Sequence, residues 1–415
     1  MPLSLKDQIR ARYEEAKLAL PKNVCRLPLF DRPVLTPGNG YPGIYLEHNL
    51  DNVFYTTIDP EVAIAGHDIF FEFQREDGLF PSAVLDTSRA QHPTGIIYQS
   101  VHVLSSLAFT AWEIAQRTQR EDFLSRAYKA CVRYDDWLTK NRDRRGTGLV
   151  EMYCEYDTGH DQSPRVKDGG IPPTCPKANA VEMPDLDFMP IIAPDLSAML
   201  YDGRVYLGKM ADALDKTAEA ETWRQRASET RQRIHDICFD PVDEFFYDVD
   251  SKGRFRKYRT EHITRMFMNG TVDQALFDRI YTRYFQDPKE FATPFPFPSI
   301  SLSDPAHDHR YPNNSWGGQS QALTAQRTIL WMAKYGRLTD FKALAQTWVN
   351  SLATSEKPFM QEMNPVTGVF SDSCPYYTPS LLMMIDFTDW LEGRPSITQT
   401  FLDQAQTSLL LTRSS

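Results

Sequence analysis

The hydrophobic residues of this chain predict pairs of consecutive helices. The first helix of each pair is apolar nearly all round, and the second is apolar on one face only. Residues 100–118 carry apolar residues nearly all round the expected helix, which is typical of a buried inner helix. In residues 121–139 the apolar positions recur every three or four residues, which predicts an outer amphipathic helix. The same couple recurs at residues 195–214 with 217–237, and at residues 317–335 with 338–352.

Repeated inner and outer helices predict an all-α fold, an (α/α)6 toroid in which helical hairpins close into a ring. A short β-hairpin is expected around residues 250–253, and residues 398–415 are expected to form a marginal helix. No Gly/Ser-rich or like-charged run separates two compositions. We therefore expect one catalytic domain over residues 1–415, with its core at about residues 40–390.

Long loops rich in proline, glycine and aromatic residues lie between the expected helices. Loops of this length in a compact domain are usually functional or disordered. Here they contain Trp, Tyr, Phe and paired charges, which favours a functional role. The loops are expected at residues 29–60, 75–97, 141–190, 286–317 and 354–380.

The composition excludes several classes of function. The 415 residues have a formal net charge of −10, from 45 basic and 55 acidic residues, which argues against nucleic acid or an anionic membrane as the partner. Six scattered cysteines form no CxxC pair, so neither a disulfide framework nor a structural zinc site is expected. The polar first residues lack an apolar signal core, so a cytoplasmic location is expected. The oligomeric state is not indicated.

Residues 157–165 combine two carboxylates, a histidine, a glycine and an arginine preceded by proline. They follow a helical pattern directly, so we expect a loop at a helix end. Loops held by a rigid scaffold carry many binding and catalytic groups. A solvated polar loop is the other interpretation of this composition.

Acid–base chemistry at a C–O bond needs one protonated and one ionised carboxyl group on opposite sides of the bond. Asp157 and Asp161 are too close in sequence to be the obvious facing pair. The best distant partner is Glu362, which lies among apolar residues before an Asn-Pro-x-Thr-Gly turn. A carboxylate in such surroundings is costly unless it is paired or used. An exposed Glu before a turn is the alternative.

Two further stretches contain side chains suited to sugar hydroxyls. Residues 311–319 supply amides, a stacking surface at Trp316, and Gln319 at the start of an apolar helix. Residues 45–55 alternate acids and amides with aromatic residues, and Tyr45 and Asp51 are the candidates there. For the first stretch, a plain helix-start turn is the alternative.

Residues 155–165, EYDTGHDQSPR, resemble the E-S-G-x-D-x-S-P-R motif of the six-hairpin glycosidases. This group includes mannosylglycerate and glucosylglycerate hydrolases, processing α-glucosidases and trehalases. By this resemblance, Asp161 is the general acid. Four weaker matches to the family lie at residues 50–54, 77–81, 316–319 and 363–368, in the same order as in the family. The resemblance therefore covers about residues 40–390.

The resemblance implies an inverting glycoside hydrolase that cleaves an α-glycosidic bond in a small glucoside or mannoside. Asp161 would protonate the leaving oxygen, and Glu362 would activate a water on the opposite face. The two carboxyl groups of such an inverting pair are expected about 6.5–9.5 Å apart. Arg165 would hold an acid in place or meet an anionic aglycone. The remaining expected sugar contacts are Tyr45, Asp51, Asp157, Trp316, Gln319 and Gln361. Neither a metal nor a cofactor is implied.

The expected base segment departs from the family pattern. The family's base stands three residues before the Asn, and that position is Gln361 in this chain. Glu362 follows one residue later, a shift that a bulge or bend in a loop can absorb. Since Gln cannot take a proton from water, we assign the base to Glu362.

Two alternatives belong to other classes. A sugar epimerase, isomerase or lyase on the same toroid would need histidines in its pocket, and His160, His262 and His309 are the candidates. A degenerate, carbohydrate-binding relative of the glycosidases would show a sugar-lined pocket with one carboxylate only.

Overall fold

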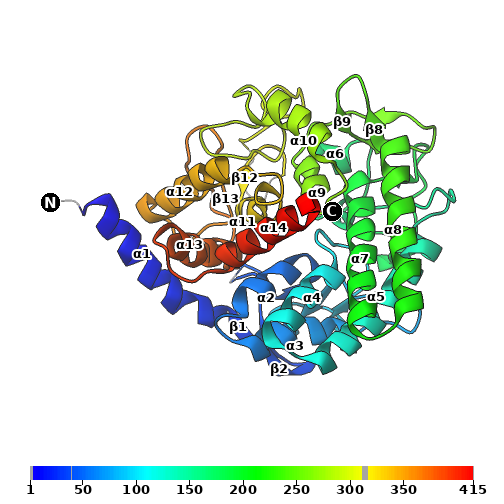
Figure 1. Ribbon diagram of the computed structural model, residues 1–415, viewed down its shortest axis with the longest axis horizontal. Helices are drawn as coiled ribbons and strands as arrows, with labels where there is room; N and C mark the ends of the chain where they lie inside the picture. Colours follow the sequence, from blue (N-terminus) through cyan, green and yellow to red (C-terminus); the bar gives the residue numbers. More distant parts are fainter. Residues whose placement is uncertain (1–2, 39, 311–315, 415) are drawn as a thin grey trace. The chain divides into compact units, whose positions relative to one another are not determined.

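The computed structural model describes residues 3–38, 40–310 and 316–414 (Figure 1). The described residues are mostly helical, and the strands among them are short and antiparallel. The all-α class expected from the sequence is therefore confirmed.

The chain divides into two compact units, and each is described by itself. The first unit contains Met1–Val24, Thr36–Tyr41 and Asp273–Ser415, and the second contains Cys25–Leu35 and Pro42–Val272. The single catalytic domain stays a prediction.

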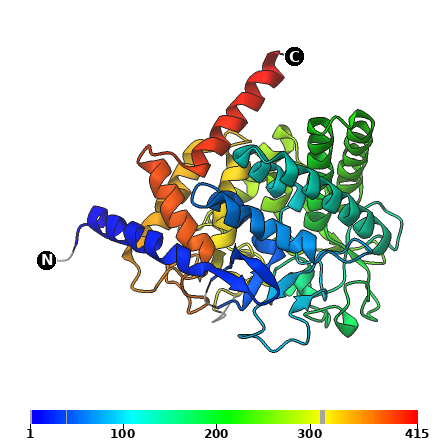
Figure 2. The ribbon, with the colours of Figure 1, turned by 90° about the horizontal axis from the view of Figure 1, so that it is seen from below.

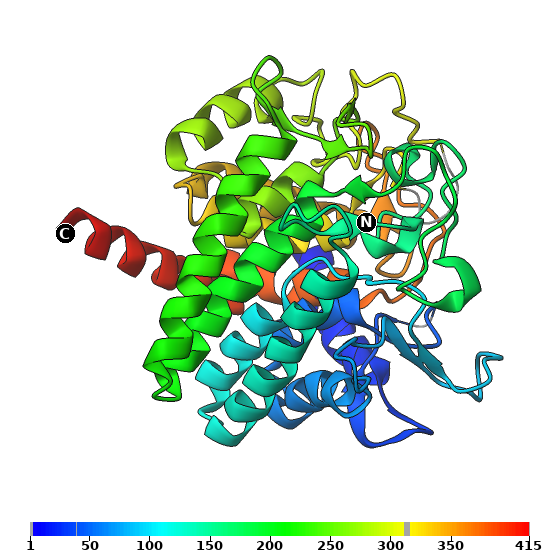
Figure 3. The same ribbon diagram turned by 90° about the vertical axis from the view of Figure 1, so that its right-hand side faces the viewer.

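The second unit is built around one long helical hairpin. Helices α7 and α8 pack side by side along their lengths, with α5 beside α7 (Figure 3). Their apolar faces are buried, as the three- and four-residue spacing predicts. The helices of this unit are α2 (Asn49–Tyr55), α3 (Pro60–Glu72), α4 (Leu107–Thr118), α5 (Glu121–Asn141), α6 (Pro164–Lys167), α7 (Pro194–Ala213), α8 (Thr217–Cys238) and α9 (His262–Met268), with 3₁₀ turns η2 (Leu46–His48), η3 (Glu155–Asp157) and η4 (Pro176–Ala178).

Small antiparallel sheets connect these helices. One sheet has the order β3-β4-β5, with Val84 paired to both Ile44 and Ile96, and another has the order β11-β10-β7-β6. The hairpin expected around residues 250–253 is the β10–β11 pair. The strands are β1 (Val24–Leu27), β2 (Phe30–Leu35), β3 (Gly43–Tyr45), β4 (Ala83–Leu85), β5 (Ile96–Ile97), β6 (Glu151–Met152), β7 (Ile191–Ile192), β8 (Phe239–Asp240), β9 (Phe245–Phe246), β10 (Asp248–Val249) and β11 (Phe255–Arg256).

The first unit packs its helices around α11 and α13. Helix α1 runs alongside α13 (Figure 2), and Arg12 of α1 donates to the carbonyl oxygens of Leu352 and Lys357 at 3.1 and 2.6 Å. The elements are α1 (Leu5–Ala19), η1 (Leu20–Asn23), α10 (Gln274–Ile280), the π-helical turn η5 (Tyr281–Phe285), α11 (Ala322–Met332), α12 (Leu338–Thr354), α13 (Thr378–Leu391), α14 (Ile397–Ser414), β12 (Ser320–Gln321) and β13 (Glu362–Met363).

The expected inner helix 100–118 is wrong at its start. Helix α4 begins after Ser106, whose side chain accepts a hydrogen bond from the backbone N–H of Phe109 and caps the first turn. His102 has a φ of +48°, which a helix does not allow. Residues 101–106 are therefore irregular. Helix α11 is likewise shorter than the expected 317–335.

The expected loop 29–60 is wrong in part, because it contains β2, β3 and helix α2. The residues that resemble the family's early substrate-binding loop, 50–54, lie on α2. No helix among the described residues combines the length and the apolar character that crossing a membrane requires.

Candidate active site

Asp157 ties the motif loop to the rest of the second unit. Its carboxylate accepts hydrogen bonds from both terminal nitrogens of Arg142, at 2.5 and 3.0 Å, and from the backbone N–H groups of Val101 and Tyr153, each at 2.7 Å. Asp157 is fully buried. Burial opposes its ionisation, but Arg142 and the backbone donors hold the pKa of the carboxyl group below its usual value. Because its oxygens are occupied, we assign Asp157 to the ordering of this loop rather than to a sugar hydroxyl.

Arg165, at the end of the motif, is the centre of a buried ionic cluster. Its guanidinium forms two-point contacts with Asp195 of α7, at 2.6 and 3.0 Å, and with Asp248 of β10, at 2.7 and 2.8 Å. Burial works against the charged forms, but this pairing holds the pKa of Asp195 far below its usual value. Arg165 therefore fastens the loop to a helix and a strand, and its donors face carboxylates of the protein instead of an aglycone.

His160 belongs to the same cluster. Its Nδ1 lies 2.9 Å from Nη1 of Arg165, and its Nε2 lies 2.5 Å from Oε1 of Glu261. Burial and the positive charge of Arg265 lower the pKa of His160 to about 3. Its Nε2 also lies 2.6 Å from Nη2 of Arg265, so arginine nitrogens face both ring nitrogens, which favours the neutral ring.

The second histidine candidate, His262, is also part of the protein interior. Its Nε2 lies 2.8 Å from the carbonyl oxygen of Phe246, and Thr260 contacts its Nδ1 at 2.5 Å. Burial lowers the pKa of His262 to about 3. His309, in the first unit, lies with its Nδ1 2.9 Å from Nε2 of His307.

Asp161 lies between these anchors, and its side chain is half-buried. Burial is the largest cause of the raised pKa values of Tyr45 and Tyr156, and the carboxylate of Asp161 adds to both. It also helps to raise the pKa of His102. Asp161 is therefore within electrostatic reach of three ring side chains, Tyr45, Tyr156 and His102, which come from three separate segments.

Asp51 lies on α2 and is 2 % exposed. Its Oδ2 is 2.8 Å from Nδ1 of His48, whose Nε2 is 3.5 Å from Oε1 of Glu47. Burial opposes protonation of His48, but hydrogen bonds to Asp51 and Glu47 raise its pKa to about 9. Among the described residues, Oδ1 of Asp51 has no hydrogen-bond partner. Asp51 thus has one buried acceptor that no described residue uses.

Sequence reasoning did not select Glu47 and His102, which form an ion pair next to the motif loop. Glu47 lies in sequence between the predicted Tyr45 and Asp51. The sequence showed only that acids and amides alternate with aromatic residues there, not that Glu47 is buried. His102 was hidden because residues 100–118 were assigned to one helix. The signal that could have revealed it is Ser105-Ser106, since Ser is a preferred N-cap and would have moved the helix start beyond His102.

Gly159 allows the motif loop to approach Glu47. Its φ is +65°, and a Cβ there would lie 2.5 Å from Oε2 of Glu47. We expect Gly159→Ala to lower the free energy of unfolding by about 1–3 kcal/mol, measured by denaturant unfolding. The matched control is Gly170→Ala, which has a φ of +83° and no atom within 4 Å of the added Cβ. Equal losses in the two variants would contradict the close approach.

The expected base segment lies in the first unit. Strands β12 and β13 pair antiparallel with Gln321 opposite Glu362, and Nε2 of Gln321 donates to Oε2 of Glu362 at 2.6 Å. Glu362 is fully buried. Side chains alternate along an extended strand, so Gln361 faces the other way, where the half-buried Tyr41 donates its hydroxyl to Oε1 of Gln361 at 3.0 Å. The separation of Asp161 and Glu362 stays a prediction, because they belong to different units.

The aromatic and amide candidates of the first unit are also largely buried. Trp316 is 3 % exposed and Gln319 is 5 % exposed. Nε2 of Gln319 donates to the carbonyl oxygen of His309. Residues 311–315 of this expected binding stretch lie outside the described residues.

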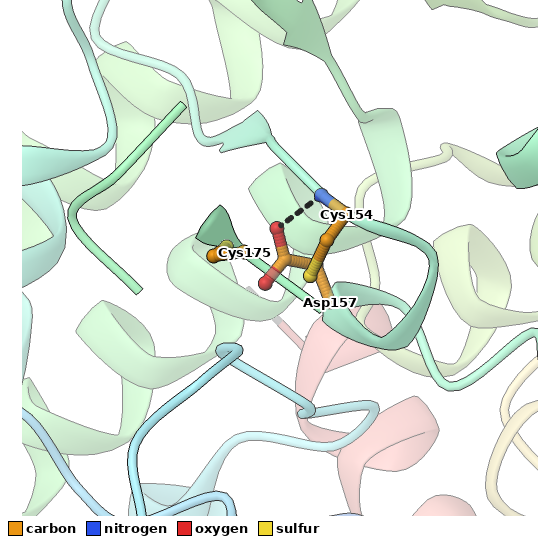
Figure 4. A group of neighbouring side chains, drawn as sticks. All are labelled: Cys154, Asp157 and Cys175. Carbon is orange, nitrogen blue, oxygen red and sulfur yellow. Dashed lines mark hydrogen bonds between the residues drawn. The ribbon is translucent and has the colours of Figure 1, made fainter. Parts of the chain in front are cut away.

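Of the residues that the structure describes, one group, Cys154, Asp157 and Cys175, has ligand atoms close enough to hold a metal ion (Figure 4). Three features argue against that role. The Asp157 oxygens are occupied by other donors, and the guanidinium of Arg142 lies 3.5 Å from Sγ of Cys175, where it would repel a cation. Burial raises the pKa of the Cys154 thiol, which disfavours the thiolate that binds metals. We assign this group to loop packing.

A family model for the mannosylglycerate hydrolase MGH1-like glycoside hydrolase domain matches residues 53–378. The chain belongs to this family. The match contains α2 from Val53 onward, the whole motif loop and the Gln361–Glu362 segment. The glycosidase resemblance of the sequence is thereby confirmed at the level of the family.

Solved structures agree with the family assignment. The mannosylglycerate hydrolase of Thermus thermophilus, in complex with Tris and D-glycerate, is 17 % identical with a TM-score of 0.71, over 91 % of this chain and 99 % of that chain. Its complex with glucose gives a TM-score of 0.68 at the same identity and coverage. Neutral trehalase Nth1 of Saccharomyces cerevisiae is 13 % identical with a TM-score of 0.62, over 94 % of this chain and 82 % of that chain. These likenesses show the six-hairpin glycosidase fold.

Proposed function

We propose that this glycoside hydrolase cleaves the α-glycosidic bond of a small glucoside or mannoside with inversion at the anomeric carbon. The observation that carries the proposal is the position of Asp161. It is a half-buried carboxyl group on a loop whose neighbouring acid and base, Asp157 and Arg165, are fully used to fix the backbone. Such a loop holds one carboxyl group in a defined orientation, as protonation of a leaving oxygen requires.

In the proposed reaction, Asp161 gives its proton to the glycosidic oxygen as the C–O bond breaks. Glu362 takes a proton from a water that attacks the opposite face of the sugar. Asp51 accepts a hydrogen bond from a sugar hydroxyl at its Oδ1, and Tyr45 packs against the ring. The Thermus relative was crystallised with glucose and with D-glycerate, which supports a small sugar with a polar aglycone as the substrate.

The stereochemistry tests the reaction directly. Hydrolysis of an α-glucoside or α-mannoside, followed by proton NMR of the anomeric signals, should show the β-sugar first and the α-sugar only after mutarotation. An α-sugar as the first product would contradict the inverting mechanism. A panel of α-glucosides and α-mannosides that are all left intact would contradict hydrolysis.

The base assignment is tested at Glu362, the first residue of β13, and at Gln361, which precedes it. We expect Glu362→Gln to lower kcat by about 10²-fold or more, because an amide cannot accept the proton of water. The matched variant is Gln361→Glu, which places a carboxylate at the family's base position. If Glu362→Gln keeps full activity, Glu362 is not the base. If Gln361→Glu restores activity to Glu362→Gln, the family's position is the functional one.

A second candidate function is sugar binding without hydrolysis, and the observation that favours it is Gln361. This amide occupies the position of the family's base and already bonds to Tyr41. A binding protein would take up a glucoside or mannoside in calorimetry and release no free sugar. Turnover gained in Gln361→Glu, with none in the wild type, would establish this alternative. The epimerase alternative loses support, because His160 and His262 are committed to interior contacts.

A further inference from the structure

Glu47 and His102 form an ion pair close to the motif loop. Oε2 of Glu47 is 3.2 Å from Nε2 of His102, and both side chains are about 10 % exposed. Burial opposes the charged forms, but His102 and His48 together hold the pKa of Glu47 well below its usual value. In return, Glu47 is the largest cause that raises the pKa of His102 against burial. Each partner therefore favours the charged form of the other.

The protein fixes His102 through the motif loop itself. The residues on both sides of His102 donate backbone hydrogen bonds to Asp157, Val101 to its carboxylate at 2.7 Å and Val103 to its carbonyl oxygen at 3.4 Å. Between these two bonds His102 adopts a left-handed φ of +48°. Such a conformation costs free energy in a non-glycine residue and persists only where its surroundings enforce it. Its imidazole is stacked on Tyr156 at 6.2 Å between ring centroids.

The same loop brings Asp161 to this pair. Gly159 lies so close to Glu47 that a Cβ would collide with Oε2, and Asp161 follows two residues later. The carboxylate of Asp161 is a second negative neighbour of His102 and favours its charged form, less strongly than Glu47 does. His102 thus has two acidic neighbours, Glu47 and the proposed acid Asp161.

We propose that Glu47 and His102 are positioning residues, in which Glu47 keeps His102 cationic and His102 sets the pH range where Asp161 carries its proton. This inference rests on the proposed role of Asp161 as the acid. A cation beside a carboxyl group favours the ionised form of that group. The His102 cation therefore moves the alkaline limit of hydrolysis to lower pH.

Other charged and titratable groups surround Glu47 and His102. Some favour the charged forms of this pair and others oppose them. Asp51 and His48 form an ion pair on the far side of Glu47. Asp157 is neutralised by Arg142. Several titratable or charged groups interact electrostatically with Asp161, His102 or their neighbours Tyr45, Tyr156 and His48. They are Tyr45 of β3, Glu47 and His48 of η2, Asp51 of α2, Arg89 of the β4–β5 loop, and Glu155 and Tyr156 of η3.

The coupling can be measured without any substrate. The imidazole of His102 is titrated by NMR in the full-length wild type, in Glu47→Gln and in Asp161→Asn. We expect its titration midpoint to fall in both variants, and to fall further in Glu47→Gln, because Glu47 is the stronger of its two negative neighbours. The partly buried His235 of α8 is the internal reference. A His102 midpoint unchanged in Asp161→Asn would overturn the proposal, whether or not the protein hydrolyses glycosides.

The pH profile of kcat/KM tests the effect on catalysis. We expect His102→Gln to move the alkaline limb to higher pH by about one unit, because the neutral side chain no longer favours loss of the acid's proton. A merely structural role would lower activity at every pH and leave the limb in place, and that result would overturn the proposal. His235→Gln is the matched control. Absence of hydrolysis in the wild type would refute the proposed function and leave the NMR test standing.

Discussion

Replacement of Asp161 by Asn is expected to lower kcat/KM for α-glycoside hydrolysis by about 10²–10⁴-fold, the range typical for loss of a general acid. Asn has nearly the same shape and cannot protonate a leaving oxygen. The loop itself should stay folded, because its anchors are Asp157 and Arg165. Steady-state kinetics on the best natural glycoside, together with the circular dichroism of the variant, measure both parts of this expectation.

The leaving group separates acid catalysis from other causes of lost activity. A glycosyl fluoride leaves without a proton from the enzyme, so Asp161→Asn should lose much less activity on it than on an alkyl glycoside. Asp185→Asn, an exposed residue of the same unit, serves as the control and should retain wild-type rates. Equal losses on both kinds of substrate would show that Asp161 does not act as the acid.

The largest expected effect on stability comes from Arg165. We expect Arg165→Leu to lower the free energy of unfolding by about 3–5 kcal/mol, because it leaves buried carboxylates without their cation. Asp195 would keep a contact with Arg265 at 3.1 Å, whereas Asp248 would lose both of its guanidinium bonds. Urea unfolding followed by tryptophan fluorescence measures this loss.

A surface arginine provides the comparison. Arg224 of α8 also contacts two carboxylates, Asp212 at 2.7 Å and Glu221 at 3.0 Å, but all three side chains are largely exposed. Water screens such pairs, so Arg224→Leu should change the free energy of unfolding far less than Arg165→Leu does. Similar losses in Arg165→Leu and Arg224→Leu would mean that the buried cluster contributes no more than a surface pair.

The helices α5, α7, α8 and α12 were predictable because their apolar residues repeat with the helical period over four or more turns. In a long helix, one or two residues that break the pattern do not hide the helical period. The face that the period marks as apolar is the face that the structure buries. The shorter helices α2 and α9 were not predicted. With seven residues each, they have two turns at most, too few for periodicity to distinguish them from loops.

The candidate site was predictable where a motif is local. Asp161 was found because the residues that position it, from Asp157 to Arg165, lie within nine positions and form a recognisable pattern. Their actual partners, Arg142, Asp195 and Asp248, come from distant parts of the sequence. Ordinary charged residues on helices and strands give no signal that they will meet in one buried cluster.

The sequence by itself determined the helical class, the family and the loop that carries the proposed acid, because each depends on local order along the chain. Only the tertiary structure decided that Asp157 and Arg165 pair with Arg142, Asp195 and Asp248, and that Glu47 pairs with His102 next to the motif loop. The physical reason is that the cost of burying a charge is offset by partners in space. Those partners become known only when the segments that carry them are packed together.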